Sequence, residues 1–358
     1  MEPSSVVDLG LFADQVEPFL RSFHDPRHHW NDTDVRGRFA HRRGGPTDLY
    51  GACDAVFLYW ITGRLHASTT GAGRADWATL IRSFQDPTSG LFLPGEGSGH
   101  GAAHATGFAT AALRLLGHAP AHRFAWAPDA FGSAAAVERW LDHLGWTIVW
   151  RGSHAAGLAA AVLDAPGCAD VPEPWTTWVL DGLRARIDPR TGLWKRSWLD
   201  RVWRRPTTID LGGAAHFWWL FERCAQPPPR ADAAFASILR LQRPNGIWGS
   251  RLHNGAFPQG IDFDALHGLR CAWLAQAASA RPALRARAFS ALDRYGAACD
   301  RFLKAPGAVR RLFHTTHKLV GTANAIAEGN RLATALGRPP IFRTPRPWCS
   351  ALTEVCWQ

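Results

Sequence analysis

Six apolar stretches recur along the chain, each opening on a short polar segment. They are rich in Ala and Gly and apolar on most sides, as is typical of helices that pack on several flanks. Their sequences are TDLYGACDAVFLYWITG from Thr47, HGAAHATGFATAALRLLG from His100, SHAAGLAAAVLD from Ser153, IDLGGAAHFWWLFE from Ile209, IDFDALHGLRCAWLAQ from Ile261 and TTHKLVGTANAIAEGNRLATALG from Thr315. The pattern predicts six inner helices.

The six stretches repeat at a nearly constant spacing. Successive polar markers near their starts are 50, 50, 62, 48 and 53 residues apart, and these markers are Asp54, His104, His154, His216, Asp264 and His317. A period of about 50 residues accommodates one helical hairpin with its loops. The spacing therefore predicts six hairpins in series.

A second kind of helix is predicted before each inner stretch. These segments are amphipathic and more charged, which indicates a solvent-facing side; they cover residues 6–23, 75–84, 134–144, 175–187, 231–241 and 284–303. The strand signal is weak, with only short β-like pieces such as Trp146 to Trp150. Six outer and inner pairs predict an all-α fold, a single (α/α)6 toroid domain spanning residues 1–358.

Three predicted outer helices end in similar loops, FQDPTSGLF, RIDPRTGLW and LQRPNGIWG. The Pro stops the helix and the Gly permits a left-handed turn. Phe92, Trp194 and Trp248 then follow, and we expect these aromatic side chains to fold back and lock the hairpins.

Composition adds a charge bias to this picture. The 358 residues are 46% hydrophobic, which is enough for a large core, and carry 40 Lys plus Arg against 30 Asp plus Glu, a net charge of +10. Lys195, Lys304 and Lys318 are the only lysines. The arginine excess is explained by a GC-rich genome or by an anionic substrate. The basic residues are scattered and match no nucleic-acid motif, so no nucleic-acid partner is expected.

The location follows from three further sequence features. The N-terminal residues lack an apolar core of a secretory signal, and no apolar run approaches the roughly 20 residues of a membrane span. The seven cysteines form no CxxC pair. We expect reduced thiols in a cytoplasmic protein without a membrane span; the pattern predicts no particular oligomeric state.

Two motifs resemble those of known toroidal enzymes. The stretch QDPTSGLFLPGEGSGHGAAHATGFATAALRLLG, with QRPNGIWG later, resembles the glutamine-tryptophan repeats of terpene cyclases and protein prenyltransferase β subunits. DPRTGLW followed by IDLGGAAHFWWLFE resembles the loop and helix unit of six-hairpin glycosidases, including unsaturated glucuronyl hydrolases. The resemblance covers most of the chain and implies a toroid, but it does not fix an activity.

Departures from these families favour the glycosidase-like alternative. The acidic DxDD motif of class II terpene cyclases is represented by Asp262-Phe263-Asp264-Ala265, which lacks the third aspartate. The cysteines offer no counterpart of the Asp, Cys and His zinc site of prenyltransferases. A second helical domain, usual in a terpene cyclase, has no room in this chain.

Parallel inner helices would bring their first turns to one rim of the barrel, where helix N-termini attract anions. The predicted catalytic residues there are Asp264, Asp262, His104, Tyr50, Asp54 and His216. The predicted substrate-binding residues are His100, His154, Arg151, Asp210, His267, His317 and Trp218. Taken singly, Asp48, Asp210 and Asp262 also suit helix caps, and each histidine also suits a hydrogen-bonded core position.

Two kinds of sugar chemistry fit these residues. Hydrolysis needs two carboxyl groups, which Asp264 would supply together with Asp54, Asp210 or Glu96. A lyase needs a His or Tyr base and a cation such as Arg151. The sequence does not choose between them.

Other roles for the rim are weaker. His100 and His104 at i, i+4 and His314 and His317 at i, i+3 are compatible with a metal, but no metalloenzyme motif accompanies them, so neither a metal nor another cofactor is expected. The sequence therefore predicts an enzyme that cleaves or modifies an oligosaccharide, and the net positive charge favours an anionic one. The alternatives are a terpene-cyclase-like enzyme with Asp264 as acid and a non-catalytic toroid that binds glycan or protein.

Overall fold

The chain is mostly helical. The computed structural model describes residues 6–95, 99–203, 205–249 and 257–358, and within these ranges two short strands, β1 (Val7–Asp8) and β2 (Phe342–Arg343), form one parallel pair. Val7 pairs with Phe342 and Asp8 with Arg343. The strands thus tie the start of the described chain to a segment near its other end.

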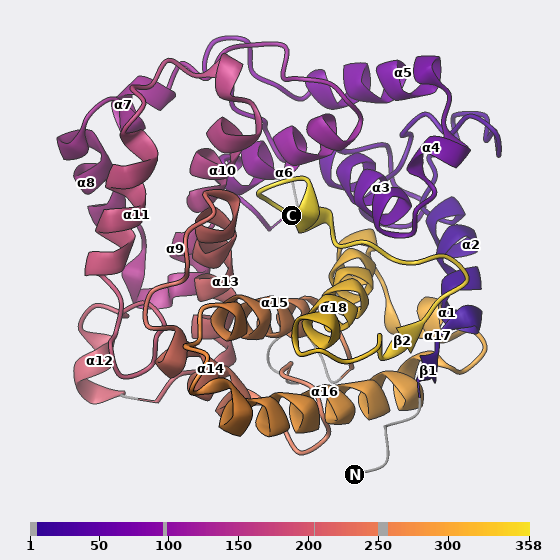
Figure 1. The fold of residues 1–358 in the computed structure, drawn as a ribbon. Coiled ribbons are helices and arrows are strands. Elements are labelled where there is room, and N and C mark those ends of the chain that lie inside the picture. The colour runs from indigo at the N-terminus through magenta and orange to yellow at the C-terminus, as the bar shows by residue number, and fades with distance from the viewer. Residues whose placement is uncertain (1–5, 96–98, 204, 250–256) are drawn as a thin grey trace.

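The predicted inner stretches are helical and contact one another in chain order. α3 (Leu49–Ile61) packs on α6 (Ala102–Leu115), α6 on α10 (Ala156–Asp164), α10 on α13 (Thr208–Arg223), α13 on α15 (Gly260–Leu274) and α15 on α18 (Thr316–Ala335). α18 also packs on α3, so the series of contacts closes on itself (Figure 1).

The more charged stretches form helices outside this closed series (Figure 1). They are α5 (Gly71–Arg82), α8 (Ala134–Asp142), α11 (Trp175–Ala185), α14 (Ala231–Leu241) and α16 (Arg281–Leu303). Shorter helices lie between them: α4 (Leu65–Ser68), α7 (Ala127–Phe131), α12 (Leu199–Val202) and α17 (Ala308–Leu312). Single 3-10 turns occur at Pro166–Cys168 and Ala351–Thr353.

Two sequence-based boundaries were wrong. The first outer segment is divided into β1, α1 (Gly10–Asp14) and α2 (Val16–Arg21). The piece around Trp146 is a 3-10 turn, Trp146–Ile148, which leads into α9 (Val149–Ser153). The Nε1–H of Trp146 donates to the carbonyl of Leu141 at 2.7 Å, a local contact that holds this turn against the end of α8.

Glycines let the inner helices approach backbone to backbone. A Cβ on Gly107 of α6 would lie 2.8 Å from the Cα of Gly157 in α10, and a Cβ on Gly321 of α18 would lie 2.7 Å from the Cα of Gly260 in α15. Real Cβ contacts are not this short, so no larger residue fits without a shift of the helices. The Ala- and Gly-rich composition of these stretches therefore reflects close packing.

The three similar loops adopt a shared turn. Gly90, Gly192 and Gly246 have φ of 77°, 67° and 91°, in the left-handed region that favours glycine. The aromatic residues that follow them, Phe92, Trp194 and Trp248, are at most 2% exposed. The prediction that these side chains fold back into the core is confirmed.

The last residues of the sequence return to the centre of the helical ring, near the C label of Figure 1. Trp357 is fully buried and Gln358 is 8% exposed. The amide of Cys356 donates to Oδ2 of Asp164 at 2.8 Å, and Asn324 of α18 hydrogen-bonds the side chain of Gln358. This closing segment, residues 355–358, packs among the inner helices.

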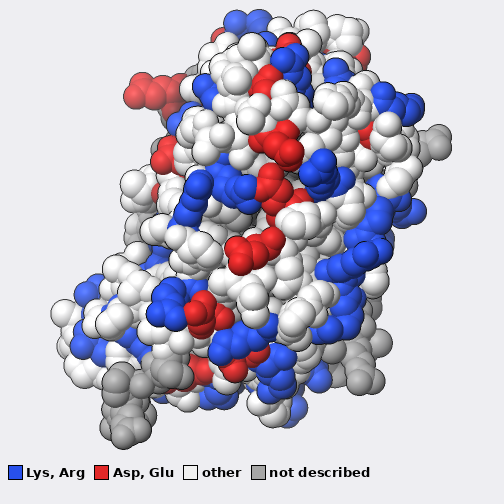
Figure 2. All heavy atoms as spheres, turned by 90° about the vertical axis from the view of Figure 1, so that its right-hand side faces the viewer, with Lys and Arg blue, Asp and Glu red and all other residues white. Residues whose placement is uncertain are grey.

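The surface carries both signs of charge. Basic and acidic side chains lie beside one another on the face that Figure 2 shows. Arg343 pairs with Asp8 and Arg27 with Asp25, both at 2.6 Å. Within the described residues, no helix combines the length and the apolar character needed to cross a membrane.

Candidate functional site

A cavity of about 290 Å³ opens where several inner helices begin. Its lining is polar and aromatic, with imidazoles as the most frequent group. The lining residues are His41, His100, His104, Trp150, His154, His216, Trp219, Gln259, Gly260, Phe263, Asp264, Thr315, His317, Lys318, Gly321 and Gln358.

Six predicted site residues line this cavity together. They are His100, His104, His154, His216, Asp264 and His317. They come from five inner segments. His100 and His104 lie at the start of α6, and His154 directly follows α9. His216 belongs to α13, Asp264 to α15 and His317 to α18. Two further predicted residues, Tyr50 and Asp54, lie behind the lining and hydrogen-bond to it.

Among the described residues that line the cavity, Asp264 is the one with a carboxyl group. It is 7% exposed, and no group in the described part of the chain donates a hydrogen bond to its carboxyl. Burial raises the pKa of Asp264 well above its ordinary value, and the nearby charge of Asp262 adds to this, while His267 acts in the opposite sense. Asp264 is therefore an uncharged acid that can donate a proton.

The imidazoles are packed against one another. The ring centroids of His100 and His104 are 4.3 Å apart and the rings are stacked, and His154 lies 5.3 Å and 4.9 Å from these two rings. His216 lies 5.4 Å from His154, and His317 lies 5.4 Å from His100. Such proximity is compatible only with mostly uncharged rings, because imidazolium ions would repel one another.

Oxygen atoms hold the Nδ1 side of three of these rings. Oη of Tyr50 lies 2.8 Å from Nδ1 of His104, Oγ of Ser153 lies 2.8 Å from Nδ1 of His216, and Oδ1 of Asp54 lies 3.0 Å from Nδ1 of His317.

Two of these bonds also fix the tautomer. The hydroxyl of Ser153 already donates to the carbonyl of Trp150 at 2.8 Å, so it accepts from Nδ1–H of His216. The carboxylate of Asp54 likewise accepts from Nδ1–H of His317. Nε2 of the His216 ring is left as an acceptor, and Nε2 of His317 becomes one in the neutral form of that ring.

Burial sets the protonation state of the cluster. Together with the charge of His317, it lowers the pKa of His100 to about 3 and that of His154 to about 4. Burial also lowers the pKa of His104 and of His216 well below the ordinary value. These four rings are neutral bases and hydrogen-bonding groups at neutral pH.

Asp54 is an anion despite complete burial. Burial acts to raise its pKa, but the charge and hydrogen bond of His317, together with His41, outweigh burial and lower the pKa below its ordinary value. The hydroxyl of Thr316 donates to Oδ2 of Asp54 at 2.6 Å. Asp54 thus orients His317 from behind the lining and does not itself face the cavity.

Besides Tyr50 and Asp54, five predicted residues lie outside the cavity lining. Asp210 and Asp262 stand at the third position of capping boxes, with Thr207 and Gln259 as the N-caps. Asp262 accepts from the amide of Trp248 at 2.7 Å, which also anchors one of the three similar loops. Both carboxylates therefore serve the starts of helices, as does Asp48, the N-cap of α3.

The other three are Arg151, Trp218 and His267. Arg151 is exposed to solvent. Trp218 is buried against Gly268 and lies 6.4 Å from Trp194, in the packing between helices. His267 belongs to a separate polar cluster. Glu96, considered as a second carboxylate, lies outside the described residues.

Several lining residues were not predicted. Trp150 and Trp219 lie four residues before His154 and three after His216, which places them on the same helical faces. This spacing could have identified Trp219 in place of Trp218. His41 lies in a loop, and Gln358 reaches the cavity only because the closing segment returns to the centre, so no periodic signal marks either residue.

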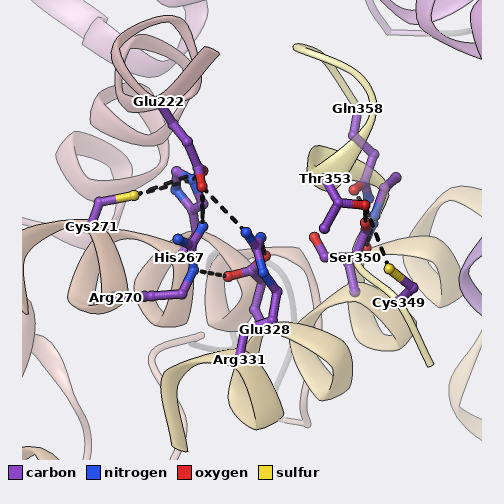
Figure 3. Close-up of polar contacts among 12 residues, drawn as sticks. Glu222, His267, Arg270, Cys271, Glu328, Arg331, Cys349, Ser350, Thr353 and Gln358 are labelled. Atoms are coloured by element: carbon purple, nitrogen blue, oxygen red, sulfur yellow. Dashed lines mark hydrogen bonds and ion pairs between the residues drawn. The ribbon is translucent and has the colours of Figure 1, made fainter. Parts of the chain in front are cut away.

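The separate cluster joins α13, α15 and α18 away from the cavity (Figure 3). Nε2 of His267 lies 2.6 Å from Oε2 of Glu222, and Arg270 bridges Glu222 at 2.7 Å and Glu328 at 2.8 Å. Arg331 pairs with both carboxylates. The two glutamate carboxylates nearly balance the positive charges of the two arginines and His267. Buried charges need such pairing to be stable.

Two groups in the described residues have their ligand atoms within 4.8 Å of one another, as a bound metal ion would require. The first is His100, His104 and His154, and the second is Glu222, His267 and Cys271. In the second, Glu222 is already occupied by the guanidinium groups of Arg270 and Arg331, which a metal ion would have to displace.

Comparison with known proteins gives no functional assignment. No known protein family matches the chain, and no curated protein sequence matches it. The chain is similar to the crystal structure of a protein from Actinoplanes, with 18% sequence identity over 90% of this chain and 98% of that one and a TM-score of 0.47. That likeness supports no statement about activity.

Proposed function

We propose that the chain is a single (α/α)6 toroid and a cytoplasmic enzyme that cleaves glycosidic bonds by acid–base chemistry in the histidine-lined cavity. The closed series of inner-helix contacts and the outer helices around it support the fold. The observation that carries the activity is Asp264, a buried carboxyl without a hydrogen-bond donor among the described residues, facing a cavity of neutral imidazoles.

In the proposed reaction Asp264 gives its proton to the glycosidic oxygen as the bond from that oxygen to the anomeric carbon breaks. The bonding electron pair stays on the leaving oxygen. A water molecule attacks the anomeric carbon, and its proton passes to Nε2 of His317, whose other nitrogen is held by Asp54. The proton on His317 then returns to solvent and Asp264 takes up a proton for the next cycle.

The cavity suits a small sugar unit with a negative group. Lys318, one of only three lysines in the chain, is exposed at the lining of the cavity and can pair with a carboxylate. α15 and α18 begin at Gly260 and Thr316, beside the cavity, and the partial positive charge of helix N-termini adds to the attraction of an anion. Trp150 and Trp219 offer flat faces to a sugar ring.

One observation favours a second candidate, a terpene-cyclase-like reaction. Trp150, Trp219 and Phe263 line the same cavity as the uncharged Asp264, and aromatic faces stabilise carbocations. In that reaction Asp264 would protonate a carbon–carbon double bond. The volume of about 290 Å³ and the many imidazoles favour the sugar substrate over a long hydrocarbon.

The test is incubation of the purified protein with two panels, uronate-containing oligosaccharides and prenyl diphosphates, with product analysis by mass spectrometry. Hydrolysis adds one water to the cleaved bond, whereas elimination leaves an unsaturated sugar. We expect hydrolysis and its loss by about 10²-fold or more in Asp264→Asn, with the exposed Asp129→Asn as control. Turnover of a prenyl diphosphate alone supports the second candidate. Full sugar turnover in Asp264→Asn contradicts the assignment of Asp264, and tight glycan binding without turnover indicates a binding protein.

A further inference from the structure

Three imidazoles of the cavity are arranged as ligands of one ion. His100 and His104 lie one helical turn apart at the start of α6, and His154 lies between α9 and α10 on the neighbouring inner segment. Each ring has one nitrogen that lies within 4.8 Å of a nitrogen of each of the other two rings. A divalent transition metal at about 2.0 to 2.1 Å from each nitrogen requires only small side-chain movements from this arrangement.

The group behind one of these rings, that of His104, resembles an outer ligand of a metal site. Metal-bound histidines commonly donate their second ring N–H to an oxygen, which fixes the ring and its tautomer. Oη of Tyr50 lies 2.8 Å from Nδ1 of His104, and both residues are buried. The hydrogen bond occupies Nδ1 and leaves Nε2 of His104 for the metal.

The charges around the three rings permit a cation. Asp54 is anionic behind the lining, and Asp264 lies on the far inner helix α15. The cations nearby are Arg151 and Lys318, which are exposed to solvent, and His317, which is paired with the carboxylate of Asp54. By contrast, two guanidinium groups contact the carboxylate of the second candidate group, so that group is not a comparable site.

We propose that His100, His104 and His154 bind one divalent transition metal ion of the zinc type, with its remaining coordination position open to the cavity. Three neutral imidazoles suit such ions, and an open fourth position is typical of catalytic and not of structural zinc sites. The proposal goes beyond the function proposed above and does not depend on it, since metal binding is measurable without a substrate.

The experiment uses Co²⁺ as a spectroscopic probe. The purified full chain is treated with a chelator, dialysed and titrated with Co²⁺, and the visible absorption of the metal centre is recorded; Zn²⁺ is then added in competition. We expect one Co²⁺ per chain, absorption typical of four or five ligands, and displacement by Zn²⁺. Absence of the absorption, or Co²⁺ binding that does not saturate near one ion per chain, would overturn the proposal.

Variants locate the ion. His100→Ala and His154→Ala, both at partly exposed positions, should each weaken Co²⁺ binding by more than 100-fold, and Tyr50→Phe by about 10- to 100-fold through loss of the outer ligand. His29→Ala changes an exposed histidine and should bind as the unmodified chain does. Circular dichroism checks that each variant is folded. Unchanged binding in folded His100→Ala and His154→Ala overturns the proposed site, whatever the result of the activity assays.

Discussion

Oδ1 of Asp54 lies 3.0 Å from Nδ1 of His317, although the two residues are separated by most of the chain. Asp54 belongs to α3 and His317 to α18, the two helices whose contact closes the series of inner helices. The bond therefore joins closure of the fold to orientation of a cavity residue. The carboxylate of Asp54 is completely buried, and its contacts with His317, Thr316 and His41 stabilise its charged form.

The first prediction concerns this pair. Asp54→Asn should leave KM nearly unchanged but lower kcat by about 10²-fold, because the amide no longer selects the Nδ1–H tautomer of His317. Steady-state kinetics on the substrate found above measures the split, and ¹⁵N chemical shifts of the His317 ring report the tautomer. An unchanged kcat together with a lost tautomer preference would show that His317 is not the base.

A second prediction tests the close approach of α6 and α10. Gly107→Ala places a Cβ 2.8 Å from the Cα of Gly157 and 2.9 Å from Cγ of Trp357. Overpacking of this kind should lower the free energy of unfolding by about 1 to 3 kcal/mol. Chemical denaturation measures the change. Gly71→Ala is the matched control, because its Cβ meets nothing within 4 Å, and it should be neutral or stabilising.

The third prediction concerns the start of α13. The hydroxyl of Thr207 accepts from the amide of Asp210, and the carboxylate of Asp210 accepts from the amide of Thr207 at 2.7 Å. Thr207→Ala should lower the free energy of unfolding by about 1 kcal/mol. Thr207→Ser keeps the hydroxyl and should recover most of this loss in the same denaturation experiment. Equal losses in the two variants would show that packing of the methyl group, and not the cap, matters.

The fourth prediction is a pH dependence of stability. Burial acts to lower the pKa of His267, but Cys271 and Glu222 outweigh burial and raise the pKa to about 10. The folded state therefore holds a proton that the unfolded state releases near pH 6.5. The resulting stabilisation is complete below pH 6.5 and is lost as the pH rises toward 10.

Denaturant midpoints between pH 6 and pH 10 measure this loss. Glu222→Gln removes the partner anion, so the midpoint of this variant should fall less steeply with rising pH, even though its stability is lower throughout. The comparison uses the difference between the two curves, in which the titrations that Glu222 does not influence cancel. Parallel curves for the two proteins would mean that His267 is not protonated in the folded state.

The sequence predicted the helical pattern well because the signal is local. Polar first turns followed by Ala- and Gly-rich segments mark α3, α6, α13, α15 and α18, and the Pro and Gly of the three loops mark the turns. Helix boundaries that depend on contacts with distant parts of the chain were less predictable, as in the first outer segment. β1 forms because Val7 pairs with Phe342, a residue far away in the sequence.

For the cavity, the sequence predicted six residues that line it but not the contacts that each carboxylate makes. Asp54, Asp262 and Asp264 occupy similar places near the starts of inner helices, yet Asp54 is held by histidines, Asp262 by backbone amides, and Asp264 by no donor in the described residues. The difference depends on which loop or helix packs opposite each carboxylate. A one-dimensional pattern does not contain that information.

Completion of the cavity depends on the closing segment, which is synthesised after the inner helices. Gln358 belongs to the lining, and the ring of Trp357 stacks on His216 at 4.8 Å and contacts His104 at 5.5 Å. The inner helices are all synthesised before the closing segment, so the histidines meet Trp357 and Gln358 only after these two residues have been made. A nascent or truncated chain thus has the ring before it has the finished site.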